Sequence, residues 1–275
     1  MNWKTIFRPT SNITVQEAQE FIRKQPVGSF VLLDVRQPKE YDREHLPGAT
    51  LIPAAQLLSE AGTLDKETPT LIYCASGVRS KAACQLLQGQ GFKDVRNISG
   101  GIKAWHGQRV AGPEDAGMEF FTASDYNDIF TMAYAMEEGL RQLYLGLAEM
   151  VTGEAEKGLL TRMAVFEEHH KTALRHGFKE EGHEINEEEL PQVMEGGLDR
   201  ERIMAHFGPH LHDMEDILNL GMLLETQAFD LYSRLSRQHE GERCQKLFHH
   251  LAEEEKRHLG YLAQRLDELL TTAAG

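Results

Sequence analysis

The sequence is poor in cysteine. Its 275 residues include three cysteines, Cys74, Cys84 and Cys244. An odd and scattered set argues against a disulfide framework and is typical of a reducing compartment, so we expect a cytoplasmic protein. Three cysteines also exclude a four-cysteine iron or zinc site within one chain.

Long hydrophobic runs are missing as well. Residues 1–25 contain no uninterrupted apolar stretch, so we expect no signal peptide. The sequence has no run of about 18 apolar residues, the length that a membrane-spanning helix needs. We therefore expect no membrane association.

Positive charge is scarce in the second part of the chain. Residues 1–110 carry 14 Lys and Arg against 10 Asp and Glu, whereas residues 111–275 carry 15 against 33. This asymmetry indicates two units with different roles. An acidic surface repels phosphate, so we expect no nucleic-acid partner.

The first 110 residues alternate short apolar runs with helical patterns. Such alternation predicts an α/β domain with a parallel sheet, covered on both faces, over residues 1–110. The expected strands are 30–34, 70–73 and 94–98, and the expected helices are 15–24 and 80–90.

Helical periodicity dominates the rest of the chain. Glycine and proline gather before it, which predicts a linker at 111–124 and an all-α domain at 125–275. A longer stretch at 178–210, with a short helix near 187–206, predicts the crossover of a four-helix bundle. The four long helices are expected at 125–150, 153–177, 211–238 and 241–271.

Cys74 directly follows the expected strand at 70–73. The loop Ala75, Ser76, Gly77 and Val78 leads to Arg79 and the next helix. Backbone N–H groups, the helix N-terminus and the arginine would stabilise a thiolate and lower the pKa of Cys74. The alternative is an inert buried cysteine. Cys84, inside the following helix, is expected in the core rather than as a resolving thiol.

Three separated motifs occur in the order found in one known family. They are the loop at 74–79, the segment LDVRQPKEY at 33–41 followed by HLPGA at 45–49, and SGGIKAW at 99–105. Together they make residues 10–108 resemble rhodanese-type sulfurtransferases. The Cys-x4-Arg loop is one residue shorter than that of cysteine-dependent phosphatases, so it suits a sulfur atom better than a phosphate group.

The resemblance implies a reaction at Cys74. The thiolate would attack a small sulfur donor, thiosulfate or a persulfide, hold the sulfur as a persulfide and pass it to a thiol acceptor. Arg79 and the loop amides would stabilise the anionic persulfide and position an anionic donor. Asp34 and Arg36 are expected to brace the loop.

A four-residue pattern occurs twice in the acidic half, 88 positions apart. Each copy has a Glu, a Tyr seven residues later, and a Glu-x-x-His thirty residues after the first Glu, so each set can lie on helix faces. Four carboxylates and two imidazoles suit a pair of iron-type metal ions. The residues are Glu137, Tyr144, Glu167 and His170, then Glu225, Tyr232, Glu255 and His258.

Apolar positions repeat at the same offset, which predicts the stripe that packs the bundle. Acids within that stripe would be buried and would repel one another unless metal ions were bound. The alternatives are a duplicated bundle that has lost its metal and, for the two tyrosines, ordinary core residues. Carboxylate and imidazole ligands accept iron, manganese or zinc.

Residues 125–271 resemble the ferritin-like di-iron carboxylate proteins and, among them, rubrerythrin. The resemblance implies that Glu137 and Glu225 are single-carboxylate ligands, Glu167 and Glu255 bridge the metals, and His170 and His258 each bind one. It also implies that Tyr144 and Tyr232 hydrogen-bond ligand carboxylates.

Two features differ from the rubrerythrin pattern. The chain has no rubredoxin-type iron centre, and Ala228 and Phe229 stand where a further carboxylate is usual. We expect two iron ions, peroxide or dioxygen as reactant, an electron donor that the sequence does not indicate, no flavin or NAD, and a homodimer. The alternative functions are a sulfurtransferase with a metal-storage bundle, and a sensor or scaffold.

Overall fold

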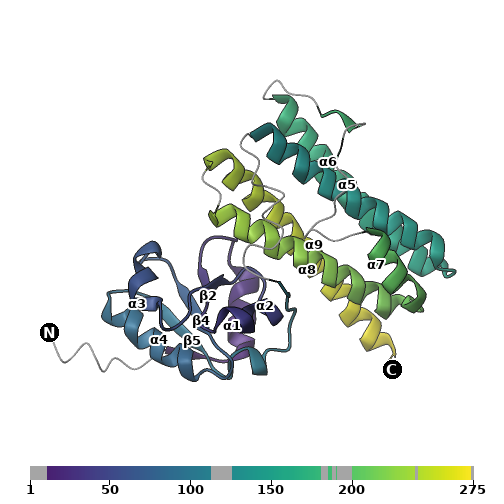
Figure 1. Cartoon of the computed structure of the whole chain (residues 1–275). Coiled ribbons are helices and arrows are strands. Elements are labelled where there is room, and N and C mark those ends of the chain that lie inside the picture. Colours follow the sequence, from purple (N-terminus) through teal and green to yellow (C-terminus); the bar gives the residue numbers. More distant parts are fainter. Residues whose placement is uncertain are drawn as a thin grey trace. The chain divides into compact units, whose positions relative to one another are not determined.

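The computed structural model describes residues 11–112, 126–180, 185–187, 190, 200–238 and 241–273 (Figure 1). Within it the chain forms two compact units, which are treated separately below. The predicted linker lies outside the described residues, apart from 111 and 112. Residues 181–184, 188–189 and 191–199 of the predicted crossover lie outside them as well.

The N-terminal unit contains a five-stranded sheet in the order β1-β5-β4-β2-β3, and every paired strand is parallel. This confirms the predicted α/β class. The short strands β1 and β3 were not predicted, because two or three residues cannot form a recognisable apolar run. The strands are β1 (Ser11–Ile13), β2 (Val31–Asp34), β3 (Thr50–Leu51), β4 (Thr70–Tyr73) and β5 (Val95–Ile98).

Helices cover both faces of this sheet. They are α1 (Val15–Lys24), α2 (Pro38–Arg43), α3 (Leu57–Glu60) and α4 (Val78–Gly89). Successive strand residues point to opposite faces. Leu32 packs with residues of α1 and α2, whereas its neighbour Leu33 packs with residues of α3 and α4. Both faces are apolar, which explains the continuous hydrophobic run of β2.

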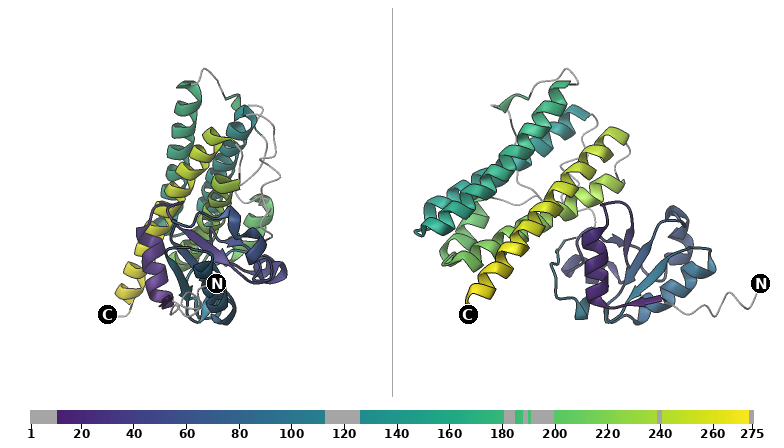
Figure 2. Two further views of the ribbon diagram at one scale, coloured as in Figure 1. Left: turned by 90° about the vertical axis from the view of Figure 1, so that its left-hand side faces the viewer. Right: turned by 180° about the vertical axis from the view of Figure 1, so that it is seen from behind.

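Four long helices pack in pairs to form the C-terminal unit, as both views of Figure 2 show. They are α5 (Tyr126–Met150), α6 (Glu154–Glu180), α8 (Met214–Gln238) and α9 (Glu242–Ala273). The crossover contains α7 (Arg200–Phe207), and most of the rest of the helix predicted near 187–206 lies outside the described residues. None of the described helices combines the length and the apolar character needed to span a bilayer.

The repeated apolar positions form the core of the bundle. All are less than 9% exposed, so the expected stripe is confirmed. They are Leu143, Leu147, Ala164, Leu174, Leu231, Leu235, Ala252 and Leu262. The polar repeat lies among these side chains, which places its acids and imidazoles inside the bundle.

Candidate active-site loop and metal centre

The Cys74 loop connects the end of β4 to the start of α4. Gly77 has φ of +91°, a conformation that L side chains rarely adopt. A Cβ there would also lie 3.0 Å from the backbone nitrogen of Gly100. The turn therefore requires glycine, and it bends the chain back so that the Gly77 N–H donates to Cys74 Sγ at 3.1 Å.

The segment at 99–105 donates backbone hydrogen bonds to the Cys74 loop. The Ile102 N–H donates to the carbonyl of Cys74 at 2.9 Å, and the Lys103 N–H donates to the carbonyl of Ala75 at 3.1 Å. Gly101 has φ of +57°, and a Cβ on it would overlap the Cys74 carbonyl oxygen. The paired glycines of this motif therefore allow a backbone-to-backbone contact that fixes the loop.

Cys74 is 1% exposed, and burial by itself would raise the pKa of its thiol. Hydrogen bonds from the Ser80 hydroxyl and from the amides of Ser80, Ser76 and Gly77 outweigh burial, so the pKa is lowered. The Ser80 hydroxyl lies 3.4 Å from Cys74 Sγ and 2.6 Å from Oδ1 of Asn97, so these two acceptors share its single proton. Ser80 was not predicted as a site residue. Its position directly after Arg79, at the start of the helix that follows the loop, could have indicated it.

Arg79 is bound to a carboxylate rather than directed at Cys74 alone. Its Nη1 and Nη2 donate to the two oxygens of Glu40, both at 2.7 Å. The hydrogen bond from Arg79 is the largest cause that lowers the pKa of Glu40 to about 2. Arg79 at the end of the loop thus forms a bidentate ion pair with Glu40 of α2, which the sequence did not indicate.

Two other predictions concern residues near the loop. Arg36 donates to both oxygens of Asp34 and, through Nη2, to the carbonyl of Glu44 at 2.6 Å, so this buried pair braces the chain after α2. Cys84 lies in the core as expected, and burial raises the pKa of its thiol to about 12. A thiol with that pKa is a poor nucleophile at neutral pH.

In the C-terminal unit the structure brings the six predicted ligands together. One glutamate comes from α5, one from α8, and a glutamate and a histidine come from each of α6 and α9. All six are at most 9% exposed. They form three overlapping groups whose ligand atoms lie within 4.8 Å of one another: Glu137, Glu167 and His170; Glu167, Glu225 and His258; His170, Glu255 and His258.

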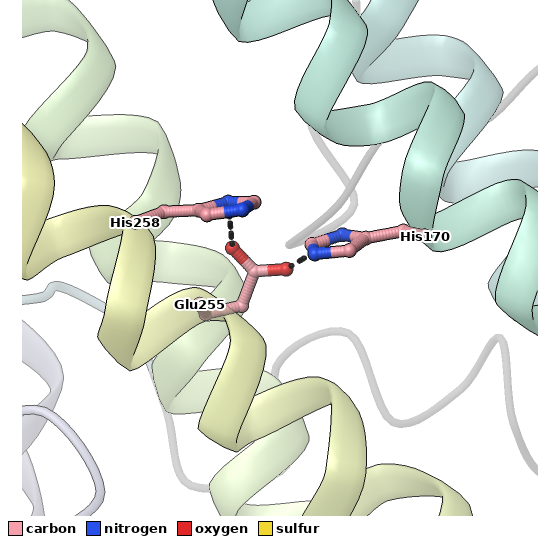
Figure 3. Close-up of side chains that lie close together, drawn as sticks. All are labelled: His170, Glu255 and His258. Carbon is pink, nitrogen blue, oxygen red and sulfur yellow. Dashed lines mark ion pairs between the residues drawn. The ribbon is translucent and has the colours of Figure 1, made fainter.

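Glu255 lies between the two imidazoles, as Figure 3 shows. One of its oxygens is 3.4 Å from Nδ1 of His170, and the other is 3.7 Å from Nδ1 of His258. The two rings stack with centroids 4.6 Å apart. Glu167 belongs to a group with each histidine, so two acids occupy positions shared by both halves of the cluster.

Each of the two repeat tyrosines donates a hydrogen bond to the glutamate of the other copy of the repeat. Tyr144 on α5 donates to Glu225 on α8 at 2.9 Å. Tyr232 on α8 donates to Glu137 on α5 at 3.2 Å. Each hydroxyl therefore orients a carboxylate contributed by the other helix pair.

The polar atoms of Glu167 test whether metal ions fit this cluster. Both of its carboxylate oxygens are buried without a well-formed hydrogen bond from the described residues: Nδ1 of His170 lies 3.5 Å from one of them and is closer to Glu137, at 2.9 Å. Burial and the negative charge of Glu225 raise the pKa of Glu167 well above its ordinary value. A buried carboxylate in this state is costly, and a bound cation removes the cost. The donor set, carboxylate oxygens and imidazole nitrogens, fits a pair of metal ions.

Position 228 differs from the usual rubrerythrin pattern in the structure as in the sequence. Ala228 is fully buried and supplies no ligand. The next acid, Asp230, accepts from Arg234 at 2.9 Å in a buried pair. Asp230 is in none of the candidate metal groups found among the described residues.

Comparison with known proteins identifies a family for each part of the chain. The model of the rhodanese-like domain family matches residues 14–108. Thiosulfate sulfurtransferase GlpE of Coxiella burnetii is 37% identical over 89 residues, which are 32% of this chain and 80% of GlpE. The chain belongs to the rhodanese family. The rubrerythrin family model matches residues 216–273, so a rubrerythrin-family domain is fused to the rhodanese domain.

Further relatives align with the rhodanese domain. The uncharacterized protein YqhL of Bacillus subtilis is 38% identical over 77 residues, 28% of this chain and 61% of YqhL. A crystal structure of a rhodanese-like domain protein from Staphylococcus aureus is 28% identical, covers 36% of this chain and 94% of its own, and has a TM-score of 0.33. The rubrerythrin match spans α8 and α9, and the ligand repeat in α5 and α6 extends the same pattern to the first helix pair.

Proposed function

We propose that this protein is a sulfurtransferase that carries sulfane sulfur on Cys74 and is fused to a dinuclear metal domain. The observation that carries the sulfur-transfer proposal is the environment of Cys74 Sγ, where a serine hydroxyl and three backbone amides lower the thiol pKa. The relationship to GlpE, whose name describes a thiosulfate sulfurtransferase, supports the same chemistry.

The proposed reaction is sulfur transfer in two steps through a persulfide on Cys74. The Cys74 thiolate attacks the outer sulfur of the donor, a Cys74–sulfur bond forms, and the sulfur–sulfur or sulfur–sulfonate bond of the donor breaks. With thiosulfate the leaving group is sulfite. A thiol acceptor then attacks the outer sulfur, takes it as a persulfide and restores the Cys74 thiolate. The loop amides stabilise negative charge on the bound sulfur throughout.

For the C-terminal domain we propose a pair of metal ions, most suitably iron. The carboxylate oxygens of Glu137, Glu167, Glu225 and Glu255 and the imidazole nitrogens of His170 and His258 would hold the ions. Bound iron would supply redox chemistry toward peroxide or dioxygen. Tyr144 and Tyr232 donate hydrogen bonds to Glu225 and Glu137, respectively, and so orient these two carboxylates. Manganese or zinc would be accepted by the same donors.

A second candidate is a bundle that binds metal without redox turnover. The absence of a carboxylate at Ala228 favours it, because one ligand usual in rubrerythrin is missing. Metal analysis combined with peroxide consumption separates the two candidates. Stoichiometric metal without peroxide consumption under reducing conditions would support storage or buffering.

Sulfur transfer is tested by cyanide trapping. Protein treated with thiosulfate or with glutathione persulfide should release thiocyanate when cyanide is added. The Cys74→Ser variant should release none, whereas Cys84→Ser should match the wild type. Equal release from wild type and Cys74→Ser would refute the assignment. The metal proposal fails if protein purified without oxygen binds less than one metal ion per chain after incubation with Fe(II).

A further inference from the structure

Glu40, the carboxylate that pairs with Arg79, has no role in the reaction as described so far. Glu40 belongs to α2 and Arg79 to the first turn of α4, 39 residues apart in the sequence. Both carboxylate oxygens accept from the guanidinium, so the contact is the bidentate arrangement that fixes two side chains most firmly. Glu40 stays ionised at neutral pH, since the pair lowers its pKa to about 2.

The Glu40–Arg79 pair lies close to the nucleophile Cys74. Arg79 is the residue before Ser80, whose hydroxyl lies 3.4 Å from Cys74 Sγ, and both stand in the first turn of α4. In agreement with this placement, the charge of Cys74 is among the causes that raise the pKa of Arg79, after that of Glu40. A sulfur donor that reaches Cys74 therefore approaches this guanidinium as well. It meets an arginine whose charge Glu40 already balances, not an isolated cation.

Stability alone does not account for the pair. The side chains of Arg79 and Glu40 are 38% and 30% exposed, and ion pairs that solvent reaches contribute little to the free energy of unfolding. The pair instead sets the net charge that a donor encounters. Without Glu40, Arg79 would attract anions, and a dianion more strongly than a monoanion. With Glu40 in place, this preference is cancelled.

We infer that Glu40 determines donor specificity, favouring organic persulfides of low negative charge over the thiosulfate dianion. The inference rests on the sulfur transfer proposed above and narrows its substrate class. The relationship to GlpE gives thiosulfate as the donor to compare.

The preferred half-reaction conserves sulfur and charge. The Cys74 thiolate attacks the outer sulfur of R–S–SH, the donor S–S bond breaks, and Cys74–S–SH and the thiolate R–S⁻ are formed. The proton remains on the transferred sulfur. The bond formed and the bond broken are both S–S bonds, so no further oxidant or reductant takes part.

The substitution Glu40→Gln tests the inference in the full chain. Glutamine removes the charge and still suits the third position of α2, where Glu40 takes part in a capping box with Gln37. We expect kcat/KM for thiosulfate, relative to kcat/KM for 2-hydroxyethyl persulfide, which has no charged group other than the persulfide itself, to rise about tenfold, which corresponds to about 1.4 kcal/mol at 25 °C.

Glu44→Gln is the matched control. Glu44 also pairs with an arginine, Arg109, at 2.7 Å, and its side chain is similarly exposed, at 39%. This variant changes the net charge equally, so its ratio of the two kcat/KM values should equal that of the wild type. A ratio in Glu40→Gln that is unchanged, or that changes as much as in Glu44→Gln, would overturn the inference.

A measurement on the wild-type protein covers the case in which Glu40→Gln does not fold. Salt weakens both attraction and repulsion between charges near the surface. If Arg79 is neutralised, added salt should raise the thiosulfate rate relative to the persulfide rate, because repulsion of the dianion by the thiolate remains. A relative fall would overturn the inference. Failure of both donors to load Cys74 would refute the proposed sulfur transfer instead.

Discussion

Replacing Glu167 by methionine should stabilise the metal-free protein and abolish its response to metal. Glu167 is fully buried, and its contact with Nδ1 of His170 is long, at 3.5 Å, so neither oxygen has a well-formed hydrogen bond from the described residues. Removal of an unsatisfied buried group is worth about 1–3 kcal/mol, and methionine has a similar length and adapts to irregular space. Most substitutions of fully buried residues destabilise, so a gain would be diagnostic.

The magnitudes are measurable by thermal unfolding of the full chain, with the helical transition followed separately. For a domain of about 150 residues, each kcal/mol shifts Tm by about 2–4 °C. Metal-free Glu167→Met should therefore melt about 2–12 °C above the metal-free wild type. Mn(II) at about one hundred times its Kd should stabilise the wild type by about 2.7 kcal/mol and leave Glu167→Met unchanged.

Glu168→Met provides the matched control. It removes the same side chain from the next position of α6, but Glu168 is partly exposed and lies 3.2 Å from Lys171 and 3.4 Å from Arg141. Loss of these contacts should cost about 1 kcal/mol or less and leave the metal response intact. If Glu167→Met is instead less stable without metal and still responds to Mn(II), Glu167 is an ordinary core residue and the metal centre is wrong.

Three further outcomes are expected. Ser80→Ala should shift the alkylation of Cys74 by iodoacetamide to higher pH, because the hydroxyl helps to lower the thiol pKa; an unchanged pH profile would assign that effect to the backbone amides alone. Gly101→Ala should cost at least about 2 kcal/mol in chemical unfolding and abolish thiocyanate release, whereas Gly62→Ala, where a Cβ meets nothing within 4 Å, should be near neutral. Tyr144→Phe should weaken Mn(II) binding about 10–100-fold in calorimetry without loss of helix content, and unaltered affinity would make this tyrosine a packing residue.

Local chemistry made much of the fold predictable. The strand β4 and the helix α1 were predicted with their observed bounds, since an apolar run and an amphipathic period are local signals. The long helices were predicted to within a few residues at each end. The described crossover helix, α7, overlaps the C-terminal part of the predicted one, and most of the remainder lies outside the described residues.

The residues that complete the sites were less accessible to sequence reasoning. Glu40 and Ser80 were not singled out, because each acts through a partner that only folding brings near. An isolated glutamate on a short helix is compatible with an ordinary solvated side chain. Its pairing with Arg79 depends on how α2 and α4 are arranged around the sheet.

The sequence by itself determined which residue types lie on which helix faces. Spacings of three and seven residues, repeated at an offset of 88, put acids, imidazoles and tyrosines among apolar side chains. It also supplied the glycines that the Cys74 loop requires. Gly77 in the loop, and Gly100 and Gly101 in the segment that contacts it, have positive φ values that other residues rarely adopt.

Only the tertiary structure decided how these faces meet. It placed Glu255 between His170 and His258. It also made the tyrosine of each helix pair donate a hydrogen bond to a glutamate of the other pair. Helical period fixes the direction of a side chain about its own axis but not the distance to another helix. That distance depends on packing of the whole core, so contacts between residues about 80–95 positions apart became visible only in the folded chain.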